Sequence, residues 1–370
     1  NAYLRCLGKS MPILSSVVID DWLSEIFTAA GCPASEARLI AENLVDADAS
    51  GHPSHGIVRV PRYIDYIASQ TVRPACAYEV ITQSGNLMLL DGQFSFGQVL
   101  GHHLVDEADR LASETGLAMI GLRHAGHLGR IGAWAEYLAE KGYISIHFVN
   151  VAGSRIVAPF GSKEACLSTA PVAIGVPNSD GDFILDFATS RVAEGKILVS
   201  QKTGSHLPPD AMVDGQGQDS DLPATIYGET AEADVPDPRA GSGAIQTFGE
   251  HKGSGLGIAC ELLAGALTGS GTNAKDSAFC NGMLSIVMDA ERWEQGNGST
   301  ASIASEIHAY ISMVRGSAPR EAGQRVLVPG DKERMLRAQA QSDGICLDEN
   351  IYSHLVRISR QFDIQTPNGV

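Results

Sequence analysis

Residues 117–150 read LAMIGLRHAGHLGRIGAWAEYLAEKGYISIHFVN and decide the fold class. The apolar run at 117–123 predicts a strand, the glycine-rich segment 124–130 a loop, residues 130–141 a helix and 143–150 a second strand. The G-x-G-x-x-G turn of a dinucleotide-binding βαβ unit is absent from this stretch. The sequence therefore predicts a chain of mixed helices and strands without a nucleotide site of the usual kind.

Outward from this stretch the same mixture continues. Residues 17–31, 35–49, 98–115 and 252–268 show helical spacing, and 87–91, 172–177, 183–187 and 282–289 are typical of strands. Residues 203–245 are rich in Gly, Pro, Asp and Ser, and this segment is too long for a loop that only connects two elements. A chain of 370 residues exceeds the roughly 250–300 residues that one core supports, so two or three lobes are expected.

The net charge of −16 argues against nucleic acid and against an anionic membrane surface as partners, because both require positive potential. No apolar run is long enough to predict a transmembrane helix. The seven cysteines are dispersed and form no C-x-x-C pair. This pattern predicts reduced thiols and a cytoplasmic protein.

The first candidate site is Ser54-His55-Gly56 with Arg59 four residues after the histidine. Histidine exchanges protons near neutral pH, and a guanidinium holds a carboxylate through paired hydrogen bonds. Side by side on one helical face, His55 and Arg59 would suit a 2-oxo acid. The alternative is a turn histidine beside a solvated basic face.

The second candidate is the loop with Gly126, Gly129 and Gly132, in which Arg130 adds charge next to a helix start. Such a loop suits a pyrophosphate or a substrate carboxylate, or else it is a turn packed on a neighbouring strand. Asp186 ends an apolar strand and could polarise a histidine or bind a ribose hydroxyl. Its alternative is a helix-capping role.

His251 and Lys252 open a long apolar helix, where the helix dipole disfavours cations. A bound phosphate would relieve this conflict; otherwise both side chains point to solvent. The H-x-x-H pairs 52/55 and 124/127 leave a metal-dependent hydrolase open as an alternative. A zinc site would need both pairs to converge, and H-E-x-x-H is absent, so no metal is expected.

Together the segments resemble the malate/L-lactate dehydrogenase family of the non-Rossmann type. The matching stretches run in family order over nearly the whole chain: SGHPSHGIVRVPRY, LDGQFSFGQ, GHLGRIGAWAEYLAEKGYISIHFVN, APFGSKE, LDFATS, AEGK, TFGEHKGSGL and LVPGDKE. The runs GHLGRIGAWAE, SIHFVNV and FGEHKG are most similar to the hydroxycarboxylate dehydrogenase branch, whose members reduce 2-oxo acids with NADH.

The resemblance implies an α+β fold with a non-Rossmann NAD(P)-binding domain on a largely antiparallel sheet, beside a discontinuous helical domain. The implied division is an N-terminal extension at 1–15, a mainly helical domain of 16–115 with 300–370, and a cofactor domain of 116–299 that carries the 203–245 excursion. It also implies a homodimer with active sites near the subunit interface, and NAD as cofactor with NADP possible.

The resemblance further implies roles for individual residues in the interconversion of small 2-oxo and 2-hydroxy acids by hydride transfer. His55 is similar to the proton donor, with Ser54 beside it, and His127 to a second active-site histidine. Arg59 is similar to the ligand of the substrate carboxylate, and Asp186 is expected to orient an imidazole. Besides His55, the expected cofactor contacts are Gly129, Arg130, Ile131, Ile184, Leu185, Asp186, Phe187, Ala188, His251, Lys252, Asn281, Gly330, Asp331, Lys332 and Glu333.

One position departs from the family pattern. Many members carry Gly-Thr-Asn-Pro where this chain has Ser168-Thr169-Ala170-Pro171. Ala170 lacks the amide of asparagine, so a changed substrate, or a catalytically silent cofactor-binding protein, is a further alternative.

Overall fold

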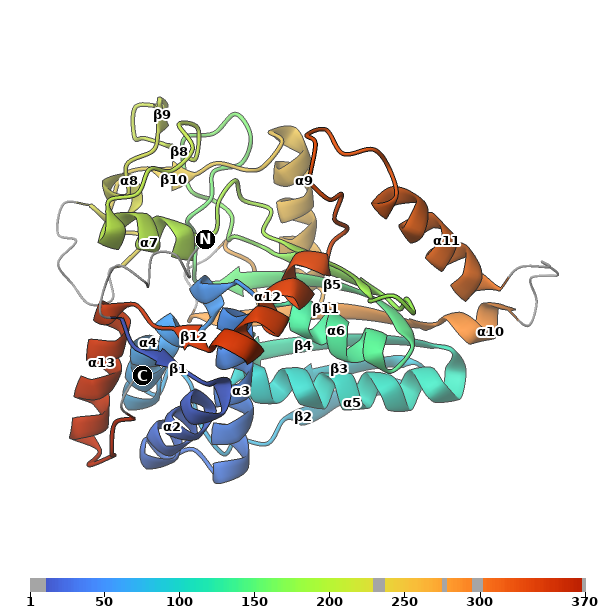
Figure 1. Ribbon diagram of the computed structural model, residues 1–370, viewed down its shortest axis with the longest axis horizontal. Helices are drawn as coiled ribbons and strands as arrows, with labels where there is room; N and C mark the ends of the chain where they lie inside the picture. The colour runs from blue at the N-terminus through green and yellow to red at the C-terminus, as the bar shows by residue number, and fades with distance from the viewer. Residues whose placement is uncertain (1–10, 229–236, 275–277, 295–301, 368–370) are drawn as a thin grey trace.

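The computed structural model describes residues 11–228, 237–274, 278–294 and 302–367 (Figure 1). Its centre is a seven-stranded sheet with the strand order β2-β3-β4-β11-β5-β6-β7. The β3–β4 pair is parallel and the other five pairs are antiparallel. The largely antiparallel order confirms the expected mixed fold. The strands are β2 (Glu79–Ser84), β3 (Leu87–Asp91), β4 (Leu117–Ala125), β5 (Tyr143–Ala152), β6 (Val172–Val176), β7 (Phe183–Phe187) and β11 (Cys280–Asp289).

Helices cover both faces of this sheet. On one face lie α5 (Gly97–Thr115) and α6 (Gly132–Glu140), whose apolar residues recur at helical spacing and pack on β4, β5 and β6. Leu104, Trp134 and Leu138 are fully buried in this core. The other face is partly covered by α9 (His251–Cys260) and its π-helical continuation η3 (Glu261–Ala266), which contact β5 and β11.

A second core lies among the helices at the other end of the molecule (Figure 1). Its first helix begins where the Ser15 side chain accepts a hydrogen bond from the Val18 amide at 3.3 Å, and it buries Ile19, Leu23 and Ile26. The elements of this helical part are α2 (Ser16–Ala29), α3 (Ala34–Ala49), the 3₁₀ turns η1 (Pro53–His55) and η2 (Ile57–Arg59), α4 (Val60–Ala68), α12 (Asp331–Asp343) and α13 (Glu349–Gln361).

Two further parts complete the fold. The expected excursion at 203–245 forms much of a small lobe with its own apolar core, which includes Ile197, Met212 and Tyr227. Its elements are α7 (Glu194–Thr203), β8 (Met212–Val213), β9 (Asp219–Ser220), α8 (Ala224–Tyr227) and β10 (Ala244–Ile245). At the opposite end, α10 (Ala290–Glu294) and α11 (Ile303–Arg315) extend beyond the sheet (Figure 1).

The observed arrangement differs from the expected division at three places. Residues 79–115 do not join the helical part, because β2 and β3 hydrogen-bond into the central sheet and α5 packs on it. Likewise α11 lies apart from the helical part. The expected extension at 1–15 ends earlier, since β1 (Ile13–Leu14) pairs with β12 (Ile345–Cys346), while residues 1–10 lie outside the described residues.

The cysteines only partly follow expectation. Cys32, Cys76, Cys166, Cys260 and Cys280 are free thiols, as expected. Cys346 is disulfide-bonded, so the prediction of seven reduced cysteines is wrong for that residue. In the part of the chain that the structure describes, every helix is too short or too polar to cross a bilayer.

Candidate active site

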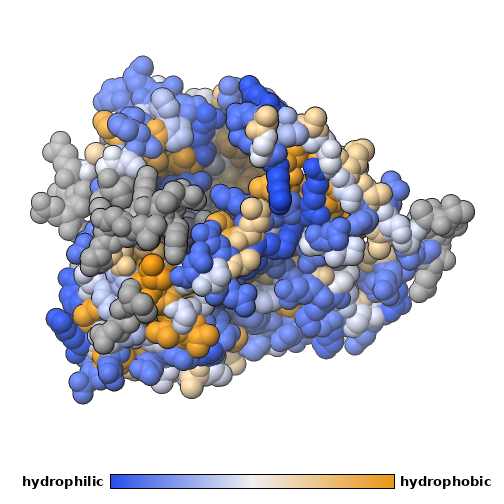
Figure 2. Space-filling model, in the orientation of Figure 1, coloured by the Kyte–Doolittle hydropathy of each residue, from blue (hydrophilic) through white to orange (hydrophobic). Residues whose placement is uncertain are grey.

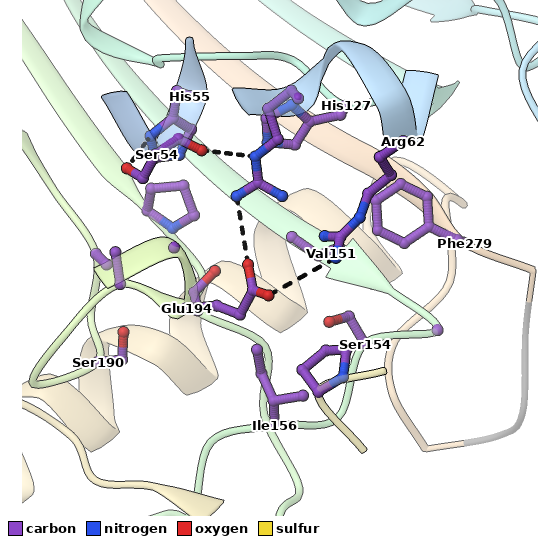
Figure 3. A pocket seen from close by; sticks show the side chains of 18 of the residues that line it. Ser54, His55, Arg62, His127, Val151, Ser154, Ile156, Ser190, Glu194 and Phe279 are labelled. Carbon is purple, nitrogen blue, oxygen red and sulfur yellow. Dashed lines mark hydrogen bonds and ion pairs between the residues drawn. The ribbon is translucent and has the colours of Figure 1, made fainter. Parts of the chain in front are cut away.

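A cavity of about 1120 Å³ opens between the helical part, the central sheet and the small lobe. Its volume is slightly above the usual range for small-molecule and cofactor sites, roughly 300–1,000 Å³. The wall brings together residues that are far apart in the sequence (Figure 3). Of the expected site residues, it includes Ser54, His55, Arg59, His127, Arg130, Ile131, Asp186, Phe187 and Ala188.

The Ser-His-Gly turn is held against α3 by a buried carboxylate. Asp48 accepts a hydrogen bond from the Ile57 amide at 2.6 Å, and burial raises the pKa of Asp48 to about 7. A Cβ at Gly56 would lie 1.9 Å from Asp48 Oδ2, which explains why this position is glycine. The turn thereby directs His55 into the cavity, where Ser54 Oγ lies 3.0 Å from His55 Nδ1.

The two candidate catalytic histidines stack on each other. The rings of His55 and His127 lie 5.6 Å apart between centroids, with an angle of 12° between their planes. Burial, reinforced by the Arg59 guanidinium, lowers the pKa of His55 to about 3 and that of His127 well below its ordinary value. Both imidazoles are therefore neutral at physiological pH in the protein without substrate.

His127 is oriented by two residues that the sequence analysis did not single out. Gln98 Nε2 donates to Tyr63 Oη at 2.8 Å, and Tyr63 Oη lies at hydrogen-bond distance, 2.7 Å, from His127 Nδ1. When the phenol donates to Nδ1, the single proton of the neutral ring lies on Nε2. Tyr63 lies one helical turn after Arg59, a spacing that could have indicated a shared face.

Arg59 is fixed rather than mobile. Its Nε donates to the Ser54 carbonyl at 2.6 Å, and its Nη2 lies 3.3 Å from a carboxylate oxygen of Glu194. The other oxygen of Glu194 lies 3.9 Å from Arg62 Nη2 (Figure 3). The same oxygen accepts a hydrogen bond from Tyr227 Oη at 2.7 Å. Sequence reasoning missed Glu194 and Tyr227, because the chain brings them to Arg59 over more than 130 residues.

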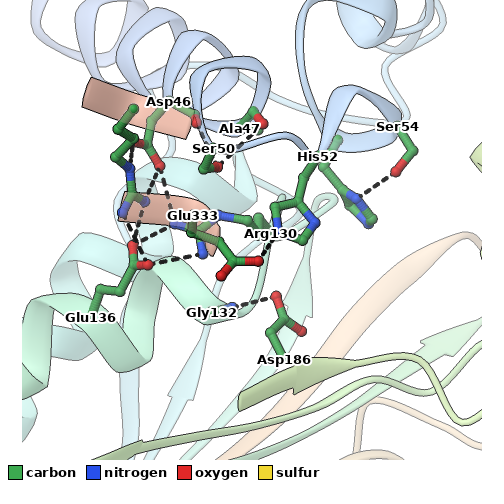
Figure 4. A network of polar contacts seen from close by, with 12 residues as sticks. Asp46, Ala47, Ser50, His52, Ser54, Arg130, Gly132, Glu136, Asp186 and Glu333 are labelled. Carbon is green, nitrogen blue, oxygen red and sulfur yellow. Dashed lines mark hydrogen bonds and ion pairs between the residues drawn. The ribbon is translucent and has the colours of Figure 1, made fainter. Parts of the chain in front are cut away.

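Asp186 lines another part of the wall. Its Oδ2 accepts a hydrogen bond from the Gly132 amide at 2.7 Å, and burial raises its pKa (Figure 4). A Cβ at Gly132 would lie 3.0 Å from the Asp186 side chain, so the glycine permits this close approach. This hydrogen bond goes to Gly132, and none joins Asp186 to His55 or His127. No hydrogen bond therefore supports the expected role of Asp186 in orienting an imidazole.

Arg130 reaches the cavity, but its charge is already balanced. Its guanidinium bonds to Asp46 and Glu136, and Arg337 from α12 bonds to the same two carboxylates (Figure 4). These four residues, the Asp46–Arg130–Glu136–Arg337 network, join α3, α6 and α12 beside the site. Arg130 therefore differs from the unpaired cation that the sequence suggested for a pyrophosphate.

The remaining expected cofactor contacts lie outside the cavity wall. Asn281 is buried and accepts a hydrogen bond from the Leu128 amide at 2.9 Å. The segments around 184 and 330 do meet, because the Ile184 amide donates to the Pro329 carbonyl at 3.1 Å. Glu333 Oε1 lies 3.2 Å from Nε2 of His52, which is a residue of the cavity wall. The residues outside the wall are Gly129, Ile184, Leu185, His251, Lys252, Asn281, Gly330, Asp331, Lys332 and Glu333.

The two other hypotheses find no support in the contacts. His124 bonds to Asp91 and stacks on Phe94, and no group of three or more His, Cys, Asp or Glu residues in the described ranges could hold a metal ion. Ala170 packs in a small buried cluster with Val172 and Cys260 rather than on the cavity wall. The alanine itself therefore contributes no atom to the wall, whereas its neighbours Thr169 and Pro171 do.

Comparisons with known proteins give one consistent result. The family model described as "Malate/L-lactate dehydrogenase" matches residues 15–356. "Hydroxycarboxylate dehydrogenase B" of Escherichia coli strain K12 is 31% identical over 350 residues, which cover 93% of this chain and 92% of that protein. "L-lactate dehydrogenase" of Cupriavidus necator is 30% identical over 357 residues, which cover 93% and 96%.

The fold has close structural counterparts as well. The crystal structure of a dehydrogenase from Sinorhizobium meliloti superimposes with a TM-score of 0.81 at 32% identity, covering 94% of this chain and 98% of that one. The similarity thus extends over nearly the entire chain and includes the strands and turns that carry the cavity.

Proposed function

Because the chain belongs to the malate/L-lactate dehydrogenase family and is thus an oxidoreductase acting on CH–OH groups, we propose that it interconverts small 2-oxo acids and 2-hydroxy acids with a nicotinamide cofactor, NAD or alternatively NADP. The observation that carries this proposal is the pair of neutral, stacked imidazoles of His55 and His127 beside Arg59 in one cavity. A proton-transfer group and a carboxylate-binding group are what the reaction requires of the protein.

Arg59 binds the substrate carboxylate. The contacts to Ser54 and Glu194 occupy its Nε and Nη2, so Nη1 is available to the substrate. His55 exchanges the proton of the substrate oxygen: as a neutral imidazole it accepts the proton of a hydroxy acid, and as an imidazolium it donates to a 2-oxo acid. Binding of a carboxylate beside Arg59 raises the pKa of His55, because it cancels the repulsion of the guanidinium.

His127 orients the reacting oxygen through its Nε2 proton, which the Gln98–Tyr63 hydrogen bonds hold in place. Ser54, whose hydroxyl lies against His55 Nδ1, fixes the ring that exchanges the proton. Proton transfer by a neutral imidazole requires one defined tautomer, which these hydrogen bonds would select.

A dinucleotide would lie along the part of the wall that Ile131, Asp186, Phe187 and Ala188 form. The Gly132 amide is bonded to the Asp186 carboxylate, and the lack of a Cβ at Gly132 lets Asp186 take its place on the wall beside Phe187 and Ala188. The cofactor, when bound, takes up or supplies the hydride at C2 of the acid. Asp186 would bind a hydroxyl of the cofactor, with Ile131, Phe187 and Ala188 against its flat surfaces. The expected contacts at 251–252, 281 and 330–333 stay predictions.

We also propose that the protein forms a homodimer. In β5 the side chains of Ile144, Ile146 and Phe148 remain partly exposed on the face opposite α6. On the neighbouring elements Ile258, Leu262, Leu267, Tyr310 and Met313 are exposed, and Figure 2 shows hydrophobic side chains gathered between α9 and α11. An apolar area of this kind marks a protein–protein contact, and a second copy of the chain is the partner that the family suggests.

Light scattering tests the dimer. A Leu262→Glu variant should be monomeric, while Leu222→Glu, at an equally exposed leucine of the small lobe, should leave the dimer intact. A monomeric wild-type protein, or a dimer that survives Leu262→Glu, would refute this arrangement.

The reaction is tested with a panel of 2-oxo acids, followed by loss of reduced-nicotinamide absorbance with each cofactor. His55→Ala should lose most turnover but still bind cofactor, whereas His206→Ala, at an exposed histidine of the small lobe, should behave as wild type. Near-wild-type kcat in His55→Ala would reject the assignment of the proton-exchanging group.

A further inference from the structure

The carboxylate-binding end of the cavity already contains a carboxylate. Glu194 projects from the first turn of α7 toward Arg59 and Arg62, which come from η2 and α4 (Figure 3). Its side chain is only 9% exposed. A group that competes with the substrate for the guanidinium needs a reason, since an uncompensated arginine would bind the substrate carboxylate more strongly.

Glu194 is held as an anion in a single position. Tyr227 donates a hydrogen bond of 2.7 Å to one of its oxygens, and the other oxygen faces Arg59. Although burial alone would raise its pKa, Arg59 and Arg62 hold the pKa of Glu194 below its ordinary value. The group is therefore a fixed negative charge at physiological pH.

The three side chains together carry one positive charge, because two guanidiniums face one carboxylate. Arg62 makes no hydrogen bond within the described residues, and its contact with Glu194 at 3.9 Å is a loose one. Of the other charged residues of the wall, Asp186 accepts from the Gly132 amide, and Asp65, Arg73 and Lys196 are exposed without a contact to this group. The balanced charges are Arg130 with Asp46 and Glu136, Arg191 with Asp210, and Arg239 with Asp237.

One substrate carboxylate neutralises this end of the cavity, and a second one next to it would not be compensated. The added charge would face the Glu194 carboxylate inside a partly desolvated cavity, where like charges repel more strongly than in water. The family name includes both kinds of acid, since lactate has one carboxylate and malate has two. The charge balance at this end therefore distinguishes between them.

We propose that Glu194 is a specificity-determining residue: as a built-in counter-ion to Arg59 and Arg62, it makes the site select 2-oxo acids with a single carboxylate over those with two. This inference rests on the proposed reaction, and it names the substrate class within it. Glu194 itself exchanges no proton with the substrate.

The test compares two acids with the same four-carbon chain, 2-oxobutanoate and oxaloacetate, of which only the second has another carboxylate. The wild-type protein should have the higher kcat/KM with 2-oxobutanoate. Glu194→Gln keeps the acceptor for Tyr227 but removes the charge, so the ratio of kcat/KM for oxaloacetate to that for 2-oxobutanoate should rise on the order of tenfold or more. Asp21→Asn, which removes the same charge next to exposed Arg38 outside the cavity wall, should leave the ratio unchanged.

Arg62→Gln removes a positive charge where Glu194→Gln removes a negative one. It also tests the proposal if Glu194→Gln does not fold. It lowers the charge at this end to zero, so the same ratio should fall. The proposal would be overturned if the ratio in both variants stays within about twofold of the wild-type ratio, or if the wild-type protein prefers oxaloacetate.

Binding separates this proposal from the reaction itself. If the wild-type protein reduces no 2-oxo acid, the proposed function fails, and calorimetry with butanoate and succinate then tests the charge selection alone. Tighter binding of butanoate by the wild type, with the difference reduced in Glu194→Gln, supports the selection. Equal binding of both acids by both proteins overturns it.

Discussion

Replacing Arg130 with glutamine should lower the stability of the whole protein, although Arg130 lies in a loop at the cavity. The side chain of Arg130 is 2% exposed and bonds to Asp46 and Glu136 (Figure 4). The change keeps a polar side chain of similar length but removes the positive charge between two carboxylates. The only guanidinium left in the network is that of Arg337.

The magnitude follows from the charges of the network. Each of the two ion pairs of Arg130 is worth about 4 kcal/mol at contact distance with an effective dielectric constant near 20. Loss of repulsion from Arg337, and water that enters to hydrate the carboxylates, offset part of this. Removing one partner of a buried pair costs about 3–5 kcal/mol. Because Arg337 still holds both carboxylates, we expect the lower end, about 3 kcal/mol.

Urea denaturation measures this loss, and Arg38→Gln is the matched control. Arg38 also bonds to two carboxylates, Asp21 at 2.7 Å and Glu42 at 2.8 Å, but its side chain is 45% exposed. Exposed pairs of this kind contribute less than about 1 kcal/mol. If Arg130→Gln and Arg38→Gln lower the free energy of unfolding equally, the reasoning from burial is refuted.

Three further predictions concern the cavity. Because the pKa of His55 is lowered to about 3, the protonated fraction of His55 falls tenfold per pH unit between pH 5 and 8. The kcat/KM for reduction should therefore fall with that slope, while the kcat/KM for oxidation stays flat. A plateau in the reduction profile up to pH 7 would contradict the assignment. Arg59→Lys loses the planar fork, and steady-state kinetics should show kcat/KM lowered on the order of 100-fold; a change below about threefold would exclude Arg59 as the carboxylate ligand. Gly56→Ala places a Cβ 1.9 Å from Asp48 Oδ2, so thermal unfolding should show a free energy of unfolding lowered by about 2 kcal/mol, and much of the turnover should be lost. A variant as stable and active as wild type would show that the turn can shift freely.

Local patterns in the sequence were enough for the elements and for part of the site. The strand–loop–helix–strand order of residues 117–150 is found as β4, α6 and β5, because its apolar spacing matches the faces that these elements bury. His55 and Arg59 both line the cavity, as their closeness in the sequence suggested, but they do not share the expected helical face, because Gly56 separates the 3₁₀ turns η1 and η2 that carry them.

Tertiary contacts decided what the sequence could not. Glu194 meets Arg59 only after the chain has passed through the central sheet, and no local pattern indicates that contact. Arg130 was expected to be an available cation, but α3 and α6 each bring a carboxylate to it. The domain boundary near residue 115 was misplaced because β2 and β3 join a sheet whose other strands come later in the chain.

The central claim is that this cavity transfers a hydride to C2 of a 2-oxo acid while His55 supplies the proton. Isotope tracing tests it most directly: the wild-type protein is incubated with a 2-oxo acid and reduced nicotinamide in which both hydrogens of the reactive carbon are deuterium, and the product is examined by mass spectrometry and NMR. One deuterium bound to C2 of the hydroxy acid for each nicotinamide oxidised is the predicted result. Nicotinamide oxidation that leaves C2 without deuterium, or no hydroxy acid with either cofactor, would contradict it.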